Sequence, residues 1–276
     1  NNTGLIGPEF TDLTTTPANP DAKRTSLIPD FAALIVKYFH DAGIEKGDKV
    51  AVGSSGSFPG LAIATICACN AYGVKADVIA SYGSSMHGGT RVELSTPRIL
   101  TLLKEKGLLE FNMLAVSPGS ANDYGVGCGE DLFFTGTRDV VVGLMLDSGY
   151  DYIDVNNLAL SIQKRLELFG DDVKLFVNVG GASMNNGTTP ATLELPAGLV
   201  ISFDNIPASP VRGLIFEYLA RGIPVINILN VKKMALDNGI PYDPVPMPQA
   251  GTSGCYKDVY HNTTYALIGL IIGFAI

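Results

Sequence analysis

A loop rich in glycine and serine joins a short apolar run, residues 49–52, to a helical pattern that begins at Phe58. This order predicts a strand, a tight loop and a helix N-terminus. Such a loop exposes backbone N–H groups at the positive end of a helix dipole, which suits an anionic ligand. The members of the expected anion-binding loop are Ser54, Ser55, Gly56 and Ser57.

Ser57 is also a candidate nucleophile, because it lies on a sharp strand-to-helix turn. The G-x-S-x-G motif is absent, so the turn alone does not identify a hydrolase. A serine nucleophile needs a base within hydrogen-bond reach. Among the three histidines, His87 lies in a loop just past the end of a predicted strand, whereas His40 lies in a helical pattern and His261 precedes an apolar tail. Ser57 and His87 are therefore the candidate catalytic pair, with a surface role for His87 as the alternative.

Polar residues follow five predicted strands, at residues 54–57, 81–85, 117–122, 180–185 and 204–205. Ligands bind at the carboxyl ends of the strands in an open parallel sheet. We therefore expect one crevice there, to which Ser183, Asp204 and Asn205 contribute, and Asp204 is a candidate to orient His87. The alternative is that glycine and serine are ordinary turn residues at these positions.

Arginine side chains are the expected partners of an anionic ligand, because a guanidinium binds a carboxylate through two parallel hydrogen bonds. Arg91 and Arg138 follow predicted loops and suit a glutamate-like ligand. Lys23 and Arg24, in a small cluster of basic and hydroxyl residues near the N-terminus, are further candidates to reach the crevice and hold carboxylates. A solvated surface charge is the alternative for each of them.

Short apolar, β-branched runs alternate with helical patterns along most of the chain. This alternation predicts an α/β fold with a largely parallel sheet and helices on both faces, a Rossmann-like three-layer sandwich. The expected strands are residues 49–52, 76–80, 113–116, 173–179, 199–203 and 224–229, and the expected helices are residues 29–43, 58–72, 96–106, 137–148, 155–169, 211–221 and 231–238.

Three segments are expected along the chain. Residues 1–29, rich in threonine, proline and asparagine, are typical of an extended arm, and residues 30–265 form the α/β domain, with a possible subdivision at 185–196. Residues 266–276 are an uncharged apolar run of 11 residues, whereas a membrane-spanning helix needs about 20. This run is either a buried last element or part of a membrane segment.

Composition and motif spacing argue against several classes of partner and cofactor. The net charge of −8, with no extended lysine and arginine cluster, argues against nucleic acid. The loop after residue 52 is neither a G-x-G-x-x-G motif nor a P-loop, so no nucleotide cofactor is expected. The sequence contains neither a C-x-x-C motif nor a cluster of histidines and cysteines, so no metal site is expected. Cys67 and Cys69 face different sides of a helix, whereas Cys128 and Cys255 lie in loops where pairing stays open.

Several motifs, in their order along the chain, resemble one known family. They are Leu-Ile-Gly-Pro-Glu-Phe-Thr-Asp-Leu-Thr-Thr-Thr at residues 5–16, Ala-Lys-Arg-Thr-Ser at 22–26, Pro-Asp-Phe-Ala-Ala at 29–33 and Val-Ala-Val-Gly-Ser-Ser-Gly-Ser-Phe-Pro at 50–59. Together they look like the bacterial poly-γ-glutamate system protein, and the resemblance is most specific over the first 60 residues. The resemblance implies a role beside the membrane proteins that make and export poly-γ-glutamate, on the extracytoplasmic face of the cell membrane. It implies no catalytic residues.

Three functions are compatible with these observations. The first is a membrane-associated accessory protein whose crevice binds the carboxylates of poly-γ-glutamate. The second is an enzyme, a hydrolase or transferase with Ser57 as nucleophile, that acts on the γ-glutamyl amide linkage. The third is a scaffold without catalysis, in which the glycine and serine turns are only turns.

Overall fold

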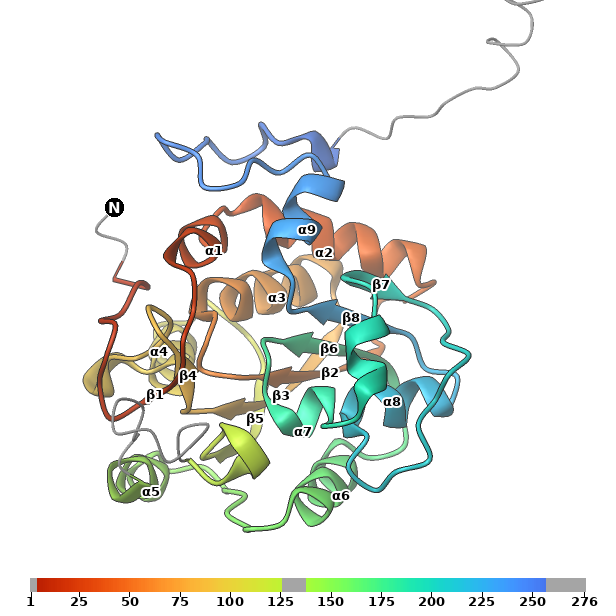
Figure 1. Ribbon diagram of the computed structural model, residues 1–276. Coiled ribbons are helices and arrows are strands. Elements are labelled where there is room, and N and C mark those ends of the chain that lie inside the picture. Colours follow the sequence, from red (N-terminus) through yellow and green to blue (C-terminus); the bar gives the residue numbers. More distant parts are fainter. Residues whose placement is uncertain (1–3, 126–137, 257–276) are drawn as a thin grey trace, which may run out of the picture.

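The computed structural model describes residues 4–125 and 138–256, and its centre is a six-stranded sheet in the order β5-β3-β2-β6-β8-β7 (Figure 1). All neighbouring strands run parallel except β7, which pairs antiparallel with β8. The predicted α/β fold with a largely parallel sheet is therefore confirmed. The strands are β2 (Lys49–Ser54), β3 (Lys75–Ser81), β5 (Asn112–Ser117), β6 (Val173–Val179), β7 (Gly198–Val200) and β8 (Val225–Ile228).

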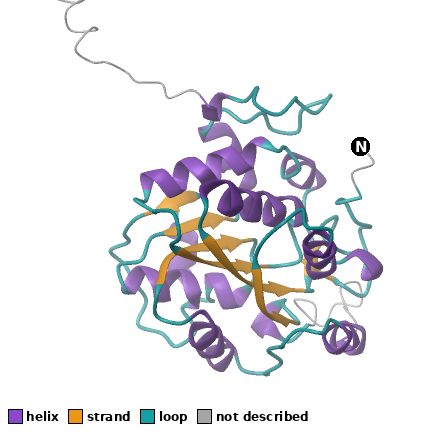
Figure 2. Cartoon of the chain, turned by 180° about the vertical axis from the view of Figure 1, so that it is seen from behind, coloured by secondary structure: helices purple, strands orange, loops and turns teal. Residues whose placement is uncertain are grey.

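Helices cover both faces of this sheet, which lies between them in the view from behind (Figure 2). One face carries α1 (Pro20–Thr25), α2 (Asp30–Asp41), α3 (Pro59–Tyr72) and α9 (Val231–Asp237), and the other carries α6 (Leu158–Phe169), α7 (Ser183–Asn186) and α8 (Gly213–Ala220). Two further helices, α4 (Thr96–Glu105) and α5 (Arg138–Asp147), add Leu100, Val141 and Met145 to the core under α2 and α3.

The central strands are apolar without interruption because both of their faces are buried. In β2, Val50 and Val52 pack into the core under α2 and α3, whereas Ala51 packs into the core under α6 and α8. Successive side chains of a strand point to opposite faces, so a strand between two helical layers needs apolar residues at every position.

Local signals in the sequence account for where the helices start and end. Pro59 lies in the first turn of α3, where its missing N–H removes no helix bond, and Gly73 ends this helix with φ +81°. The Asn157 side chain accepts a hydrogen bond of 2.9 Å from the Leu160 N–H at the start of α6.

The N-terminal segment differs from the extended arm that the sequence predicts. Asn19 and Pro20 begin helix α1, and β1 (Thr14–Thr16) pairs parallel with β4 (Ser84–Ser85) in a separate two-stranded sheet. The Asn19 side chain accepts a bond from the Asp21 N–H, which is an N-cap that composition alone does not reveal. This segment therefore lies along the edge of the domain and contributes to it.

The possible subdivision, the cysteines and the apolar C-terminal run are the remaining features that the sequence singles out. Residues 185–196, the possible subdivision, lead from α7 to β7, which belongs to the same sheet as β6 and β8. Cys67, Cys69 and Cys255 form no disulfide with another described residue. Cys128 and residues 266–276 lie outside the described residues. Within residues 4–125 and 138–256, no helix has both the length and the apolar character needed to cross a membrane.

Candidate functional site

Two loops rich in glycine and serine interlock at the carboxyl ends of β2 and β3. The Gly56 N–H donates to the Gly83 carbonyl at 3.0 Å, and the Gly89 N–H donates to the Gly56 carbonyl at 2.8 Å. A Cβ at Gly56 would lie 2.5 Å from the Tyr82 carbonyl oxygen, so a larger residue does not fit there. The glycines let the two backbones touch, and this contact brings Ser57 and Ser85 together.

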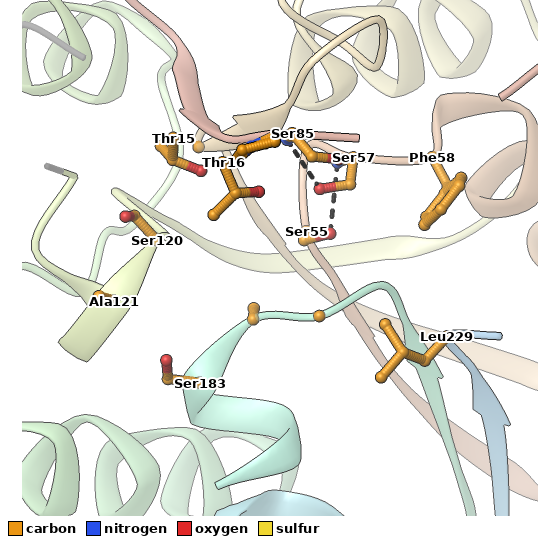
Figure 3. A pocket seen from close by; sticks show the side chains of 14 residues that line it. Thr15, Thr16, Ser55, Ser57, Phe58, Ser85, Ser120, Ala121, Ser183 and Leu229 are labelled. Atoms are coloured by element: carbon orange, nitrogen blue, oxygen red, sulfur yellow. Dashed lines mark hydrogen bonds between the residues drawn. The ribbon is translucent and has the colours of Figure 1, made fainter. Parts of the chain in front are cut away.

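A pocket of about 240 Å³ lies over these loops, at the carboxyl edge of the sheet (Figure 3). Its walls come from β1, β4, the loops after β2, β5 and β6, the residue after β8, and the start of α7. Phe58 and Leu229 form apolar parts of the wall. The hydroxyl side chains that line it are Thr15, Thr16, Ser55, Ser57, Ser85, Ser120 and Ser183.

Lys23 of α1 lies behind this hydroxyl-lined wall and is 1% exposed. Its Nζ donates to the Ser85 Oγ at 2.7 Å and to the Ser57 carbonyl, and it lies 3.8 Å from the centre of the Phe58 ring. Among the described residues it has no carboxylate partner within ion-pair distance. Burial therefore lowers the pKa of Lys23 to about 7, because the charged form loses its hydration.

A chain of hydrogen bonds connects the three serines that follow β2 and β3. The Ser85 N–H donates to the Ser57 Oγ at 3.0 Å, and the Ser57 N–H donates to the Ser55 Oγ at 3.3 Å (Figure 3). Ser57 and Ser85 are each 9% exposed, so their hydroxyls lie at the pocket wall and not in open solvent. Lys23, Ser85 and Ser57 thus form one fixed cluster.

The amino end of α3 lies at the same pocket. Phe58 is the N-cap of this 14-residue helix, has no side-chain cap and lines the pocket. The first N–H groups of a helix have no partner within the helix, and the helix dipole places partial positive charge there. Negative charge that develops in this part of the pocket is therefore stabilised.

Four buried asparagines fix the loop after β6. The Asn185 Nδ2 donates to the Gly53 carbonyl at 2.9 Å and to the Asn178 Oδ1 at 3.0 Å. The Asn178 Nδ2 donates in turn to Asn186 and Asn227. These bonds hold the start of α7 against the end of β2, and they place Ser183 across the pocket from Ser57.

A buried ion pair fixes the loop after β5. Arg165 and Asp123 are 1% and 0% exposed, and their charged groups lie 2.8 Å apart. The Asp123 carboxylate also accepts from the hydroxyls of Ser117 and Ser161 and from the Gly119 N–H. The bonds hold Asp123 at φ +59°, a left-handed backbone that costs energy outside glycine. They keep the neighbouring pocket wall in place.

The structure brings together only part of the serine loop that the sequence predicts as an anion site. Ser55, Ser57 and Ser183 line the pocket. Ser54 is buried and its Oγ donates to the Ser55 carbonyl at 3.0 Å, so its hydroxyl is used within the loop. Gly56 serves the contact between the two loops.

His87 is not hydrogen-bonded to Ser57. Its backbone has φ +62°, its N–H donates to the Pro8 carbonyl, and its side chain is half-buried outside the pocket lining. The Ser57 Oγ instead accepts from the Ser85 N–H. The basic group beside these serines is Lys23, which comes from the N-terminal segment.

The three arginines expected to hold a carboxylate ligand are bonded elsewhere. Arg24 binds Asp21 and Asp243, and Arg138 binds both carboxylate oxygens of Asp154 at 2.8 Å. Arg91 is exposed and donates to the Ile6 carbonyl at 3.3 Å. Among the described residues, no arginine or lysine lines the pocket.

Asp204 and Asn205 lie away from the pocket because β7 runs in the opposite direction to its neighbour. The carboxyl end of an antiparallel strand lies at the amino edge of the parallel strands beside it. Both residues are exposed, and Asn205 lies 3.5 Å from Glu194. Only the ends of the parallel strands therefore meet at the pocket, and the fifth expected strand end, that of β7, does not. Asp204 consequently does not orient a base at this site.

Nothing in the sequence pairs Lys23 with Ser85. The sequence indicates Lys23 as a cation for ligand carboxylates, and Ser85 as part of a polar strand end. The burial of Lys23 on the inner side of the short helix α1 becomes visible only in the folded chain. Comparison of the chain with models of known families and with curated proteins found no match.

Proposed function

We propose that the pocket is the active site of a serine acyl hydrolase or acyltransferase, with Ser85 as nucleophile and Lys23 as general base. The observation that carries this proposal is the 2.7 Å contact between the Lys23 Nζ and the Ser85 Oγ at a pocket wall. A base works best when its pKa lies near the operating pH, and burial lowers the pKa of Lys23 to about 7. At pH 8 most of Lys23 is a neutral amine that accepts a proton.

The proposed reaction balances within this pair and the substrate. The Ser85 Oγ attacks the carbonyl carbon of an amide or ester while its proton moves to the Lys23 Nζ. The bond from that carbon to the leaving group breaks, and the leaving nitrogen or oxygen takes the proton from Lys23. Water, or an amine acceptor in a transferase, then attacks the carbonyl carbon of the acyl-enzyme and gives a proton to the Lys23 Nζ. The bond from that carbon to the Ser85 Oγ breaks, and the Oγ takes the proton from Lys23, which returns both side chains to their starting state.

Two features of the pocket support this chemistry beyond the pair itself. The amino end of α3 at Phe58 supplies the positive potential that an oxyanion needs. The Ser57 Oγ is bonded to the Ser85 N–H at 3.0 Å, so it fixes the backbone of the nucleophile. Ser57 is therefore a positioning residue in this proposal, and not the nucleophile.

The proposed substrate is the γ-glutamyl amide linkage, and this part rests on the resemblance to the poly-γ-glutamate system protein. The same resemblance supplies the proposed location at the extracytoplasmic face of the membrane and the proposed partners, the membrane proteins of that synthesis and export system. A pure carboxylate-binding role has less support, since Arg24, Arg91 and Arg138 are engaged outside the pocket. We therefore favour catalysis over binding alone.

Labelling with a fluorophosphonate tests the nucleophile directly, because this probe reacts with activated serines. We expect one labelled peptide containing Ser85, and a labelling rate that rises from pH 6 to pH 8 as Lys23 loses its proton. Ser85→Ala should abolish labelling and Lys23→Met should slow it by about 100-fold or more. Ser183→Ala is the matched control, since Ser183 lines the same pocket without contacting Lys23 in the structure, and it should label at the parent rate.

The position of the label also separates the alternatives. A label on Ser57 that persists in Ser85→Ala would identify Ser57 as the nucleophile in place of Ser85. Absence of any label would contradict the proposal that the protein is a serine enzyme. Calorimetry with γ-linked and α-linked glutamate oligomers, followed by product analysis, completes the test. Products formed only from the γ-linked oligomer would support the proposed substrate. Selective binding of the γ-linked oligomer without products would support the accessory role. Absence of binding to either oligomer would favour the scaffold without catalysis.

A further inference from the structure

Helix α1, which carries Lys23, is too short to be stable without help from the rest of the chain. It has six residues, and isolated helices of fewer than about 12 residues are marginal in water. Burial of the Lys23 ammonium without a carboxylate partner among the described residues also opposes the docking of this helix, because the ion loses its hydration. Contacts from other segments must therefore hold α1 on the domain.

One such contact comes from Asp243, which is 219 positions beyond Arg24 in the chain. The Arg24 Nε donates to the Asp243 Oδ1 and the Arg24 Nη2 donates to the Asp243 Oδ2, each at 2.7 Å. The Asp243 N–H donates to the Thr25 Oγ at 2.9 Å, and Thr25 is 0% exposed. Three hydrogen bonds thus join Asp243 to the two residues that directly follow Lys23.

This pair differs from an ordinary surface ion pair. Exposed pairs contribute little to stability unless a guanidinium meets both oxygens of the carboxylate, which is the geometry of Arg24 and Asp243. The hydrogen bond from Arg24 lowers the pKa of Asp243, so this carboxylate is ionised at neutral pH. The bond to Thr25 adds a contact that water does not reach.

The segment that carries Asp243 is itself fixed at both ends. Ile240 is 1% exposed at one end, and the Gly251 N–H donates to the Asp30 carboxylate at 2.7 Å at the other. Asp243 has φ +48° between them, a left-handed backbone that persists outside glycine only where the surroundings hold it. Asp243 therefore meets α1 from a fixed position.

Asp243 reaches Lys23 only through the helix. Asp243 and Asp21 both bind Arg24, whereas the Lys23 Nζ bonds to the serine side of the helix, at Ser85. The lowered pKa of Lys23 comes from burial and not from a neighbouring charge. The pair of Arg24 and Asp243 can thus affect the base by fixing the position of α1.

We propose that Asp243 is a positioning residue, which holds Lys23 beside Ser85 through Arg24 and helix α1. The inference rests on the function proposed for Lys23 and Ser85, and it adds a residue outside the lining of the pocket. Without the pair, α1 moves outward and water reaches the Lys23 Nζ. The pKa of Lys23 then returns towards its ordinary value, and less neutral amine is present to take the serine proton at neutral pH.

Asp243→Asn tests the pair, because asparagine keeps the size of the side chain and tolerates the left-handed backbone. The pH profile of fluorophosphonate labelling at Ser85 should move up by about one unit, so labelling at about pH 6 slows about 10-fold. The difference should shrink at about pH 9.5, where Lys23 is neutral in both proteins. Asp237→Asn is the matched control, since it breaks the exposed pair with Lys233 on α9, and it should label like the parent.

Acetylation of Lys23 by acetic anhydride, followed by mass spectrometry, measures the position of the amine without requiring enzyme activity. In Asp243→Asn the midpoint of its pH profile should rise, and its rate at high pH should increase as water and reagent reach Nζ. Arg24→Lys is a milder variant, since lysine keeps the charge but cannot meet both carboxylate oxygens. It should move both quantities in the same direction by a smaller amount.

A double variant tests whether the two residues act as one pair. Arg24→Gln combined with Asp243→Asn should change the Lys23 profile no more than the stronger single variant, because either change removes the same contact. Additive effects would overturn the proposal. An unchanged Lys23 profile in a less stable Asp243→Asn would overturn it too, since the pair would then support only the fold.

The two proposals fail in different ways. A parent protein that fluorophosphonate does not label at Ser85 would contradict the proposed enzyme. The acetylation profiles would still decide whether Asp243 holds Lys23 in place. A labelled parent with equal profiles in Asp243→Asn and Asp237→Asn would retain the enzyme and overturn the role of Asp243.

Discussion

Lys23 is a cationic side chain that folding removes from water without giving it a carboxylate partner in the described part of the chain. Its hydrogen bonds go to the Ser85 hydroxyl and the Ser57 carbonyl, neither of which carries a charge. Desolvation therefore dominates, and the pKa of Lys23 falls to about 7. A group that costs stability in this way at neutral pH is more typical of a functional site than of a structural core.

The cost of burying Lys23 can be measured as a dependence of stability on pH. In the unfolded chain Lys23 keeps its ordinary pKa, so between about pH 7 and pH 10 the unfolded state binds more protons than the folded state. Stability therefore rises with pH through this window. The parent should gain about 2–3 kcal/mol more than Lys23→Met between pH 6 and pH 9, measured by urea unfolding. Equal pH dependence of the two proteins would show that Lys23 is not desolvated.

At the scale of elements, the site depends on close contacts between the ends of strands. β2 and the start of α7 approach so closely that a Cβ at Gly53 would lie 2.6 Å from the Asn185 Oδ1. Asn185 is itself held by Gly53 and Asn178, so it has little room to move. The glycine in β2 thus sets the spacing between the loop after β2 and the loop after β6.

Substitution of Gly53 tests this spacing. Gly53→Ala should destabilise the protein by about 1–3 kcal/mol, because the new methyl group displaces a buried and bonded side chain. Gly143→Ala is the matched control, since Gly143 lies in α5 with nothing within 4 Å of its Cβ position. Alanine there should be neutral or stabilise the helix by up to about 1 kcal/mol. Denaturant midpoints that fall equally in both variants would contradict the account of Gly53.

The elements themselves were largely predictable from sequence, whereas their directions and neighbours were not. Uninterrupted apolar runs predicted the buried parallel strands, and glycines such as Gly73 predicted the helix ends. The residues around β7 carry no signal of its antiparallel direction, which is why Asp204 was expected at the wrong edge. Lys23 and Ser85 are 62 positions apart, and the burial that changes the chemistry of Lys23 exists only in the folded chain.

At the scale of the whole molecule, distant parts of the chain are joined around the site. β1 and α1 precede the sheet in sequence, yet β1 supplies Thr15 and Thr16 to the pocket and α1 supplies Lys23 behind it. After α1 ends at Thr25, α2 begins at Asp30, and residues 249–256 bond to the Asp30 side chain. The helix that carries Lys23 thus lies in the chain between β1, which lines the pocket, and α2, to which residues 249–256 are bonded.

Asp30 connects the last described residues to the domain. Its carboxylate is 0% exposed and accepts from the N–H groups of Gly251 and Ser253 at 2.7 and 3.0 Å and from the Tyr256 hydroxyl at 3.0 Å. Burial alone would raise the pKa of Asp30, but the bonds from Ser253, Gly251 and Tyr256 outweigh it, so the pKa is lowered. The stabilisation is thus present above the ordinary carboxyl pKa and is lost as pH falls through the lowered value.

Asp30→Asn should consequently lose about 1–3 kcal/mol of stability at pH 7, since an amide places N–H groups against backbone donors. The difference from the parent should narrow as pH falls through the lowered pKa of Asp30, because the protonated parent carboxyl loses the same bonds. Asp171→Asn, at an exposed position, is the control and should match the parent at neutral and at acidic pH. Hydrogen exchange should place the faster-exchanging amides of Asp30→Asn at Gly251 and Ser253. A uniform loss of protection, or a difference that does not narrow at all as the solution is acidified, would show that Asp30 supports α2 and not the attachment of residues 249–256.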